Sequence, residues 1–134
     1  MLDHVGMTVL DFARSRAFYV AALAPLGYAP VMDVTKEQTG GYEGTGFGAD
    51  GKPSFWIGNG ARASGPIHVA LVAKSRGDVD RFYAAAIAAG GRDNGPPGIR
   101  EHYHPDYYGA YVRDLDGNKL CVVCHNPAVA VAAE

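Results

Sequence analysis

The sequence predicts an α+β fold made of two tandem copies of one βαβββ module. The first observation is an internal repeat, because a shift of 64 positions aligns the segment from His4 to Gly27 with the segment from His68 to Gly91. The second is that each copy begins with a short alternating strand and continues with apolar residues at helical spacing. Self-similarity at one fixed offset indicates a duplicated structural unit. The identical pairs are His4 and His68, Val5 and Val69, Phe18 and Phe82, Tyr19 and Tyr83, Ala21 and Ala85, Ala22 and Ala86, Ala24 and Ala88, and Gly27 and Gly91.

Length and charge bound the class of protein. At 134 residues the chain is long enough for one core and too short for two, so the copies should be halves of one domain. Twelve Lys and Arg residues stand against 14 Asp and Glu with no basic run, which excludes a nucleic-acid binder and favours a small uncharged or weakly anionic ligand. The start of the chain lacks the pattern of a signal peptide, and no apolar run reaches membrane-spanning length. We therefore expect a cytoplasmic protein without a nucleic-acid or membrane partner.

Module one, at residues 1–58, begins with a strand over 2–9 whose residues alternate between two faces. The helix that follows has Asp11 as its N-cap and stops at Gly27. Three strands complete the module after turns rich in Gly and Asp. They are expected at residues 28–34, 42–48 and 54–58.

Module two, at residues 67–126, follows a connector rich in Gly, Ala and Ser at 59–66. Its expected elements are a strand at 67–73, a helix with Ser75 as its N-cap, a loop rich in Gly and Pro at 94–98, and strands at 107–113 and 119–125 joined by an Asp-Gly-Asn hairpin. The two modules make one domain over residues 1–126, and residues 127–134 form a C-terminal tail.

Two histidines and two cysteines are the first candidates for chemistry. His4 and His68 occupy the same point of the two copies, so they are candidates to meet at a shared centre, and imidazole is the commonest protein ligand for zinc, iron and related ions. Cys121 and Cys124 lie three positions apart in one strand and point to opposite faces, which argues against a shared metal or a disulfide.

The duplicated module, the opening His-Val-Gly-Met-Thr-Val, the Phe-Tyr pair of each helix and the closing Asp-Leu-Asp-Gly-Asn-Lys-Leu-Cys-Val-Val-Cys-His are similar to the vicinal oxygen chelate superfamily. This superfamily contains glyoxalase I, bleomycin-resistance proteins and extradiol dioxygenases. The resemblance covers nearly the whole chain. It implies a sheet that curls around a cup.

In the metal-dependent members of this superfamily, the first strand of each module supplies a His or Gln and the last strand a Glu. The resemblance carries the His positions onto His4 and His68, whereas the acidic positions fall at Trp56 and Cys121. The sequence thus departs from the usual ligand set. A set of His4, His68 and Cys121 would suit zinc with one open position, and we take these three residues as the predicted ligands of a divalent metal, zinc or iron. The alternative for Cys121 is a small buried hydrophobe.

Four further residues are predicted to contact a ligand. His102 and His104 belong to a chemically dense loop that enters a strand next to Tyr108, where they could form the rim of the cup. The alternative is a solvated aromatic loop. Trp56 would stack on an aromatic or apolar ligand or close the pocket.

Two functions from different classes follow from these residues. The first is a metal-dependent enzyme, a lyase or dioxygenase, acting on a small molecule with adjacent oxygens. The alternative is a metal-free binding protein of bleomycin-resistance type that sequesters a small aromatic or apolar molecule. In both cases we expect a homodimer, because half-barrels expose sheet edges that need cover. The sequence leaves open whether the site lies within one chain or across the dimer.

Overall fold

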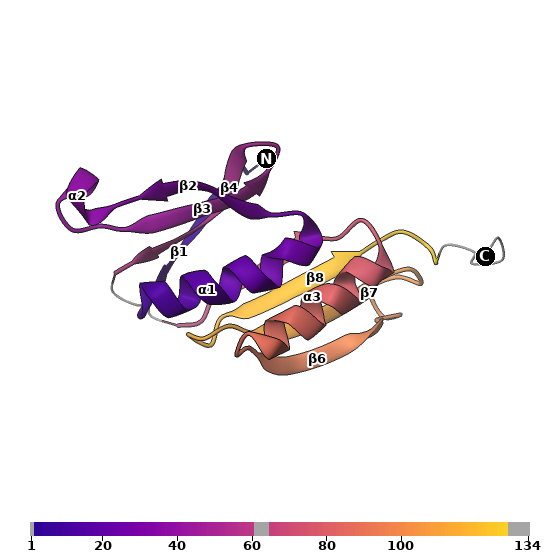
Figure 1. The fold of residues 1–134 in the computed structure, drawn as a ribbon. Helices are drawn as coiled ribbons and strands as arrows, with labels where there is room; N and C mark the ends of the chain where they lie inside the picture. The colour runs from indigo at the N-terminus through magenta and orange to yellow at the C-terminus, as the bar shows by residue number, and fades with distance from the viewer. Residues whose placement is uncertain (1, 61–64, 129–134) are drawn as a thin grey trace.

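The computed structural model describes residues 2–60 and 65–128 (Figure 1). The predicted α+β class and the two tandem modules are confirmed. The elements of module one are β1 (Val5–Val9), α1 (Phe12–Leu23), the 3-10 helix η1 (Ala24–Leu26), β2 (Ala29–Val34), α2 (Lys36–Thr39), β3 (Gly44–Ala49) and β4 (Lys52–Asn59). Those of module two are β5 (His68–Val72), α3 (Arg76–Ala88), β6 (Arg92–Ile99), β7 (Tyr108–Arg113) and β8 (Lys119–Cys124).

Each module forms its own four-stranded mixed sheet, and the two sheets have the same topology. The strand orders are β1-β4-β3-β2 and β5-β8-β7-β6, with one parallel pair in each sheet, β1 with β4 and β5 with β8. The registers match as well, because Gly6 pairs with Trp56 in module one and Ala70 pairs with Cys121 in module two. Trp56 and Cys121 therefore occupy equivalent positions of the repeat.

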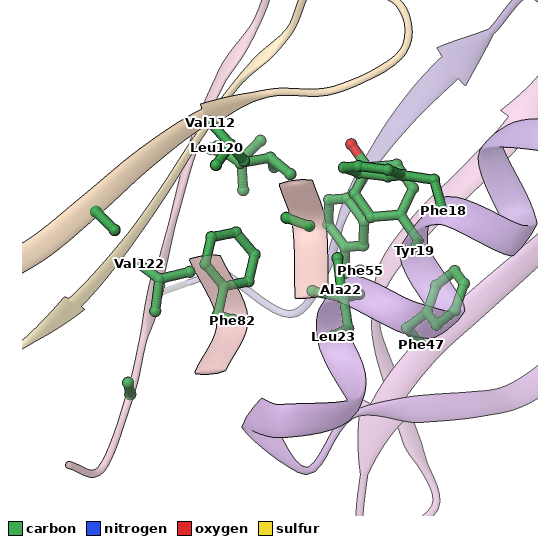
Figure 2. Close-up of a cluster of buried hydrophobic side chains, with 14 of the residues drawn as sticks. Phe18, Tyr19, Ala22, Leu23, Phe47, Phe55, Phe82, Val112, Leu120 and Val122 are labelled. Atoms are coloured by element: carbon green, nitrogen blue, oxygen red, sulfur yellow. The ribbon is translucent and has the colours of Figure 1, made fainter. Parts of the chain in front are cut away.

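Helices α1 and α3 lie side by side, each against the sheet of its own module (Figure 1). Their N-caps are those predicted, since Asp11 accepts a hydrogen bond from the backbone of Arg14 and Ser75 from that of Asp78. The apolar faces of both helices and both sheets merge into one core (Figure 2). The labelled members of that core are Phe18, Tyr19, Ala22, Leu23, Phe47, Phe55, Phe82, Val112, Leu120 and Val122.

The face of each sheet that lies opposite its helix is called the open face below. In β8, Leu120, Val122 and Cys124 belong to the core, whereas Cys121 is not part of it, as strand alternation requires. In β4, Phe55 belongs to the core and Trp56 does not. The predicted opposite orientation of the two cysteines agrees with this arrangement, and both are free thiols.

A hydrogen-bond network joins the β7–β8 hairpin of module two to α1 of module one. Asp114 is buried, and its carboxylate accepts bonds from the backbone of Asp116 at 2.9 Å, the backbone of Asn118 at 2.8 Å and the amide of Asn118 at 3.1 Å. The hydroxyl of Tyr19 donates to the same carboxylate at 2.6 Å. Burial and the neighbouring Asp114 raise the pKa of Tyr19 well above its ordinary value, so the phenol stays a donor.

The prediction of a loop at 94–98 is wrong, because this segment lies inside strand β6. The prediction failed because Pro96 and Pro97 lack a backbone donor and argue against a strand. Strand β6 is an edge strand with two register shifts against β7, between Asp93 and Gly95 and between Gly95 and Gly98, and edges and bulges tolerate proline.

Two smaller points concern the rest of the chain. The predicted turn at 36–41 contains the short helix α2. This helix begins with a capping box formed by Thr35 and Gln38. Part of the connector and most of the tail, at 61–64 and 129–134, lie outside the described residues. None of the helices within 2–60 and 65–128 is long and apolar enough to cross a membrane.

Candidate functional site

Aromatic rings lie on a floor of glycines on the open face of module one. Trp56 is half-buried and pairs with Gly6 on one side and Gly46 on the other. A Cβ atom at Gly46 would lie 2.8 Å from two atoms of the indole ring, so the ring lies directly over this glycine. Only glycine leaves room for the indole in this position.

Tyr42 occupies a second stretch of the same floor. Its ring lies over the cross-strand pair Gly44 and Gly58, since a Cβ atom on either glycine would collide with the phenol ring. Tyr42 itself is exposed. The open face of module one thus presents two partly accessible aromatic side chains, which is suited to stacking with a planar apolar molecule.

The equivalent position in module two is closed. Cys121 is 1% exposed, and its thiol lies 3.7 Å from the hydroxyl of Tyr107, whose hydroxyl is in turn 3.4 Å from that of Tyr111. Burial raises the pKa of the Cys121 thiol. The thiol is therefore covered and less readily ionised, whereas reactive cysteines are accessible and have a lowered pKa.

A cluster of aromatic and imidazole rings provides this cover. The rings of His102 and Tyr103 have centroids 4.2 Å apart, and those of Tyr103 and Tyr107 are 4.6 Å apart. His104 stacks on His125 beyond the end of β8 with centroids 5.1 Å apart. The loop at 100–107 thus folds onto the open face of module two, and it brings His102 and His104 into one cluster with Cys121.

The hydrogen bonds of His104 define its tautomer when the ring is neutral. Its Nδ1 accepts a bond from the backbone N–H of Asp106 at 3.1 Å, so the proton resides on Nε2. Nε2 lies 2.9 Å from Nδ1 of His125 and donates to it. His104 therefore ties the loop to the end of β8, and both of its ring nitrogens already have partners.

The two repeated histidines are both exposed. His4 precedes β1, is exposed, and has its Nδ1 2.7 Å from the carboxylate of Asp3, which also pairs with Lys52 at 3.1 Å. Hydrogen bonds from His4 and Lys52 lower the pKa of Asp3. His68 is also exposed and pairs with Lys119 at the start of β5 and β8.

The residues that the structure brings together do not fit the metal that the resemblance implies. Across 2–60 and 65–128, no group of three or more His, Cys, Asp or Glu side chains could hold a metal ion. The positions of the superfamily's carboxylates hold an indole at Trp56 and a covered thiol at Cys121. Within one chain, His4, His68 and Cys121 are thus not gathered into one ligand set.

Tyr108 lies on the helix side of its sheet. Its hydroxyl donates to Asp80 of α3 at 2.6 Å, and the guanidinium of Arg76 lies 5.3 Å from the centre of its ring. Burial and the bond to Asp80 raise the pKa of Tyr108 to about 12. The neighbouring tyrosines 107 and 111 face the open side instead. Sequence reasoning missed Tyr111, although alternation through Cys121 and its cross-strand partner could have found it.

A hollow of about 260 Å³ lies where β1 and β4 of one module approach β5 of the other. Its lining includes His4 and Ser54 from module one and Ala70 and Val72 from module two. Two exposed apolar side chains also line it, Val72 at 68% exposure and Leu2 at 84%. The lining also includes Phe55 of the core and Val5, which packs against it, so the hollow lies at the edge where the two modules meet.

Comparisons with known proteins agree with this architecture. Residues 1–122 match the family model for the Glyoxalase/Bleomycin resistance protein/Dioxygenase superfamily. No functionally curated protein matches the chain. A glyoxalase/bleomycin resistance protein from Albidiferax ferrireducens T118 is 32% identical, with 90% of this chain and 95% of that chain covered and a TM-score of 0.71.

Two more distant structures share the fold. A mutant of the fosfomycin resistance protein FosX from Listeria monocytogenes, complexed with Mn(II) and 1S,2S-dihydroxypropylphosphonic acid, is 17% identical, with 99% of this chain and 95% of that chain covered and a TM-score of 0.67. A mutant of glyoxalase I from Zea mays is 20% identical, with 91% of this chain but 46% of that chain covered and a TM-score of 0.66. The duplicated module, the paired sheets and the family match together show that the chain belongs to the Glyoxalase/Bleomycin resistance protein/Dioxygenase superfamily.

Proposed function

We propose that this protein binds a small planar aromatic or apolar molecule without a metal, in the manner of the bleomycin-resistance branch of its superfamily. The observation that carries the proposal is the position of Trp56. It occupies the place where, by the resemblance, metal-dependent members have a carboxylate, and its indole lies on a glycine floor beside Tyr42. Stacking on an indole is worth about 0.5–1.5 kcal/mol beyond the burial of its area.

The state of Cys121 supports the same conclusion. The thiol of Cys121 faces the hydroxyl of Tyr107, and within the described residues it is not part of a group of three side chains that could hold a metal ion. Neither position at which the resemblance places a carboxylate holds one in this chain. One holds the indole of Trp56 and the other holds the covered thiol of Cys121. The name of the Albidiferax ferrireducens relative includes bleomycin resistance, which is compatible with a binding role.

Calorimetric titration with 2-naphthamide, a neutral planar probe, tests this proposal. Protein purified without a His-tag and treated with EDTA should bind the probe, Trp56→Ala should lose that binding at least tenfold, and Trp56→Phe should retain most of it because a phenyl ring still stacks. Circular dichroism of each variant checks that the fold is intact. Binding that is equal in wild type and Trp56→Ala would overturn the proposal.

The alternative function, the metal-dependent enzyme predicted from the sequence, leads to the opposite expectation for metal content. A lyase or dioxygenase that uses His4, His68 and Cys121 requires about one equivalent of zinc or iron per site and loses it on His68→Ala. The FosX structure with Mn(II) shows the shared fold holding a metal in another protein. Elemental analysis of the tag-free protein therefore discriminates between the two functions.

The homodimer also remains a prediction. The exposed apolar side chains of Leu2 and Val72 flank the seam between the modules, and burying them in a second copy would remove apolar area from water. Sedimentation equilibrium should give twice the mass of the chain for the wild type. Leu2→Asp combined with Val72→Asp should shift the equilibrium toward the monomer if the seam is the interface.

A further inference from the structure

Four basic residues form one continuous row across the open face of module two. Arg92 of β6 pairs with Arg113 of β7, Arg113 pairs with Lys119 of β8, and Lys119 pairs with His68 of β5. Directly paired residues project from the same face of a sheet, and His68 and Lys119 alternate with the core positions beside them. These four residues are called the basic row.

The basic row is expected to lower the stability of the fold, because its side chains lie opposite each other without acidic partners. Like charges directly opposite each other in a sheet are destabilising. Five cations elsewhere in the described residues have acidic partners, namely Arg16 with Asp33, Lys36 with Glu43, Lys52 with Asp3, Arg76 with Asp106 and Arg81 with Asp78. Throughout the described part of the chain, no carboxylate forms an ion pair with a member of the basic row. The protein has a net charge of −2, so the row does not follow from a general excess of cations.

Two members of the row have only neutral partners. Arg113 donates to the side-chain oxygen of Asn94 at 3.1 Å and to the backbone oxygen of Gly117 at 3.2 Å. The ammonium of Lys119 lies 4.9 Å from the centre of the Tyr111 ring. These contacts hold the side chains in place and leave their positive charges uncompensated.

Arg100 adds a further positive charge to this field. The guanidinium of Arg100 lies 5.2 Å from the centre of the same Tyr111 ring, and the ammonium of Lys119 lies 4.9 Å from that centre. The two positive charges are therefore at most about 10 Å apart. Both cations lie against the Tyr111 ring, so a carboxylate or phosphate bound beside that ring would experience positive charge from both. Arg and Lys are the side chains that recognise such oxyanions, Arg through a planar fork of donors.

Module one has no such feature. Because Trp56 and Cys121 are equivalent, the residue that corresponds to Lys119 is Ser54, two positions earlier in the strand. Of the row, only His68 has a basic counterpart at the equivalent point, His4. The positive field is therefore specific to the face that lies across the seam from Trp56.

We propose that the basic row, with Arg100, binds the anionic group of the ligand whose planar part stacks on Trp56. The ligand class is then an aromatic compound that carries a carboxylate or a similar oxyanion. This inference rests on the proposed function and adds the charge of the ligand to it. It also gives a reason for a row of basic side chains that have no acidic partners.

The test compares 2-naphthoate with 2-naphthamide by isothermal titration calorimetry at low salt. The two probes share a ring and differ in charge, so the wild type should bind 2-naphthoate at least tenfold more tightly. Lys119→Gln and Arg113→Gln should each remove most of that advantage, so that the two probes bind with similar affinity. Arg14→Gln removes an exposed cation of α1 outside the row and should behave as wild type.

The outcomes separate the two proposals. Equal affinities of the wild type for the two probes, or equal effects of Lys119→Gln and Arg14→Gln, would overturn the inference while the proposed function stands. If neither probe binds, the proposed function fails, and inorganic phosphate then tests the row alone. Phosphate should shift the backbone amide signals of residues 68 and 119 in NMR spectra of the wild type but not of Lys119→Gln, and the absence of a shift in the wild type would overturn the inference.

Discussion

The two modules agree on the side that faces the core and differ on the side that faces out. Phe18 and Phe82 are equivalent in the repeat and both fully buried, whereas Trp56 and Cys121 are equivalent and chemically unrelated. Module one presents aromatic rings on glycine, and module two presents a basic row next to a closed ring cluster. The comparison shows that the same phenylalanine fills the core in both modules, whereas the equivalent positions of the open faces hold chemically different side chains.

The largest expected effect tests the shared core. Phe18→Ala and Phe82→Ala should each lower the free energy of unfolding by about 3–5 kcal/mol, because each leaves a cavity among buried residues. Urea denaturation followed by circular dichroism measures both. A loss below about 1 kcal/mol at one of the two sites would contradict the equivalence of the modules in the core.

The next effect concerns the joint between the modules. Asp114→Ala should lower the free energy of unfolding by about 1.5–3 kcal/mol, because it removes a charged acceptor and leaves the buried hydroxyl of Tyr19 without its partner. Tyr19→Phe removes one bond and no charge, so it should cost less. Equal stability of wild type and Asp114→Ala would show that the hairpin of module two does not stabilise its contact with α1.

The glycine floor of module one gives a smaller and more local effect. Gly46→Ala places a methyl group 2.8 Å from the indole of Trp56, so the ring must move. We expect a shift of the tryptophan emission maximum and about a tenfold loss of 2-naphthoate affinity, equal to about 1.4 kcal/mol. Gly6→Ala is the matched control, because its Cβ would lie 3.6 Å from Cβ of Trp56, an ordinary contact. Identical spectra for the two variants would mean that the floor does not position the ring.

Because Cys121 is covered on the open face of module two, we expect its thiol to react slowly. Since burial raises the pKa of Cys121, its modification by iodoacetamide at pH 8 should be slow and should accelerate as the pH rises toward that pKa. Tyr107→Ala removes the cover and should increase the rate at pH 8. The experiment uses a Cys124→Ala background so that one thiol reports. A fast reaction in the presence of intact Tyr107 would refute the closed pocket.

The smallest effect is a pH dependence confined to module one. Hydrogen bonds from Thr45 and Arg16 lower the pKa of Asp33 in the folded state. A lowered pKa contributes stability that is present above the unfolded value and lost as the pH falls through the folded value. The wild type should therefore lose stability below about pH 4, the ordinary range of an Asp, and Asp33→Asn should lose less over the same interval. If the free energy of unfolding falls with pH in the same way for the wild type and Asp33→Asn, Asp33 does not contribute to the pH dependence.

Much of the fold could be predicted because it depends on local pattern. The repeat indicated the two modules, alternation indicated the opposite faces of Cys121 and Cys124, and both helix N-caps were identified from single residues. Strand β6 could not be predicted, because local sequence around Pro96 argues against a strand and only pairing with β7 makes it one.

The site was predicted less well because it depends on contacts between distant segments. The loop that contains His102 and His104 was expected at the rim of a cup, but its folding over Cys121 depends on the bond of His104 to His125, which no local pattern indicates. The basic row depends on register across four strands. Alternation can assign Lys119 to a face, but it cannot show that Arg113 lies opposite.

Titration of EDTA-treated, tag-free protein with 2-naphthoate by calorimetry tests the central claim most directly, namely that the open faces bind an aromatic ligand without a metal. The account predicts binding that EDTA leaves unchanged and that Trp56→Ala abolishes. Binding that appears only after zinc or iron is added, and that His68→Ala abolishes while Trp56→Ala does not, would contradict it.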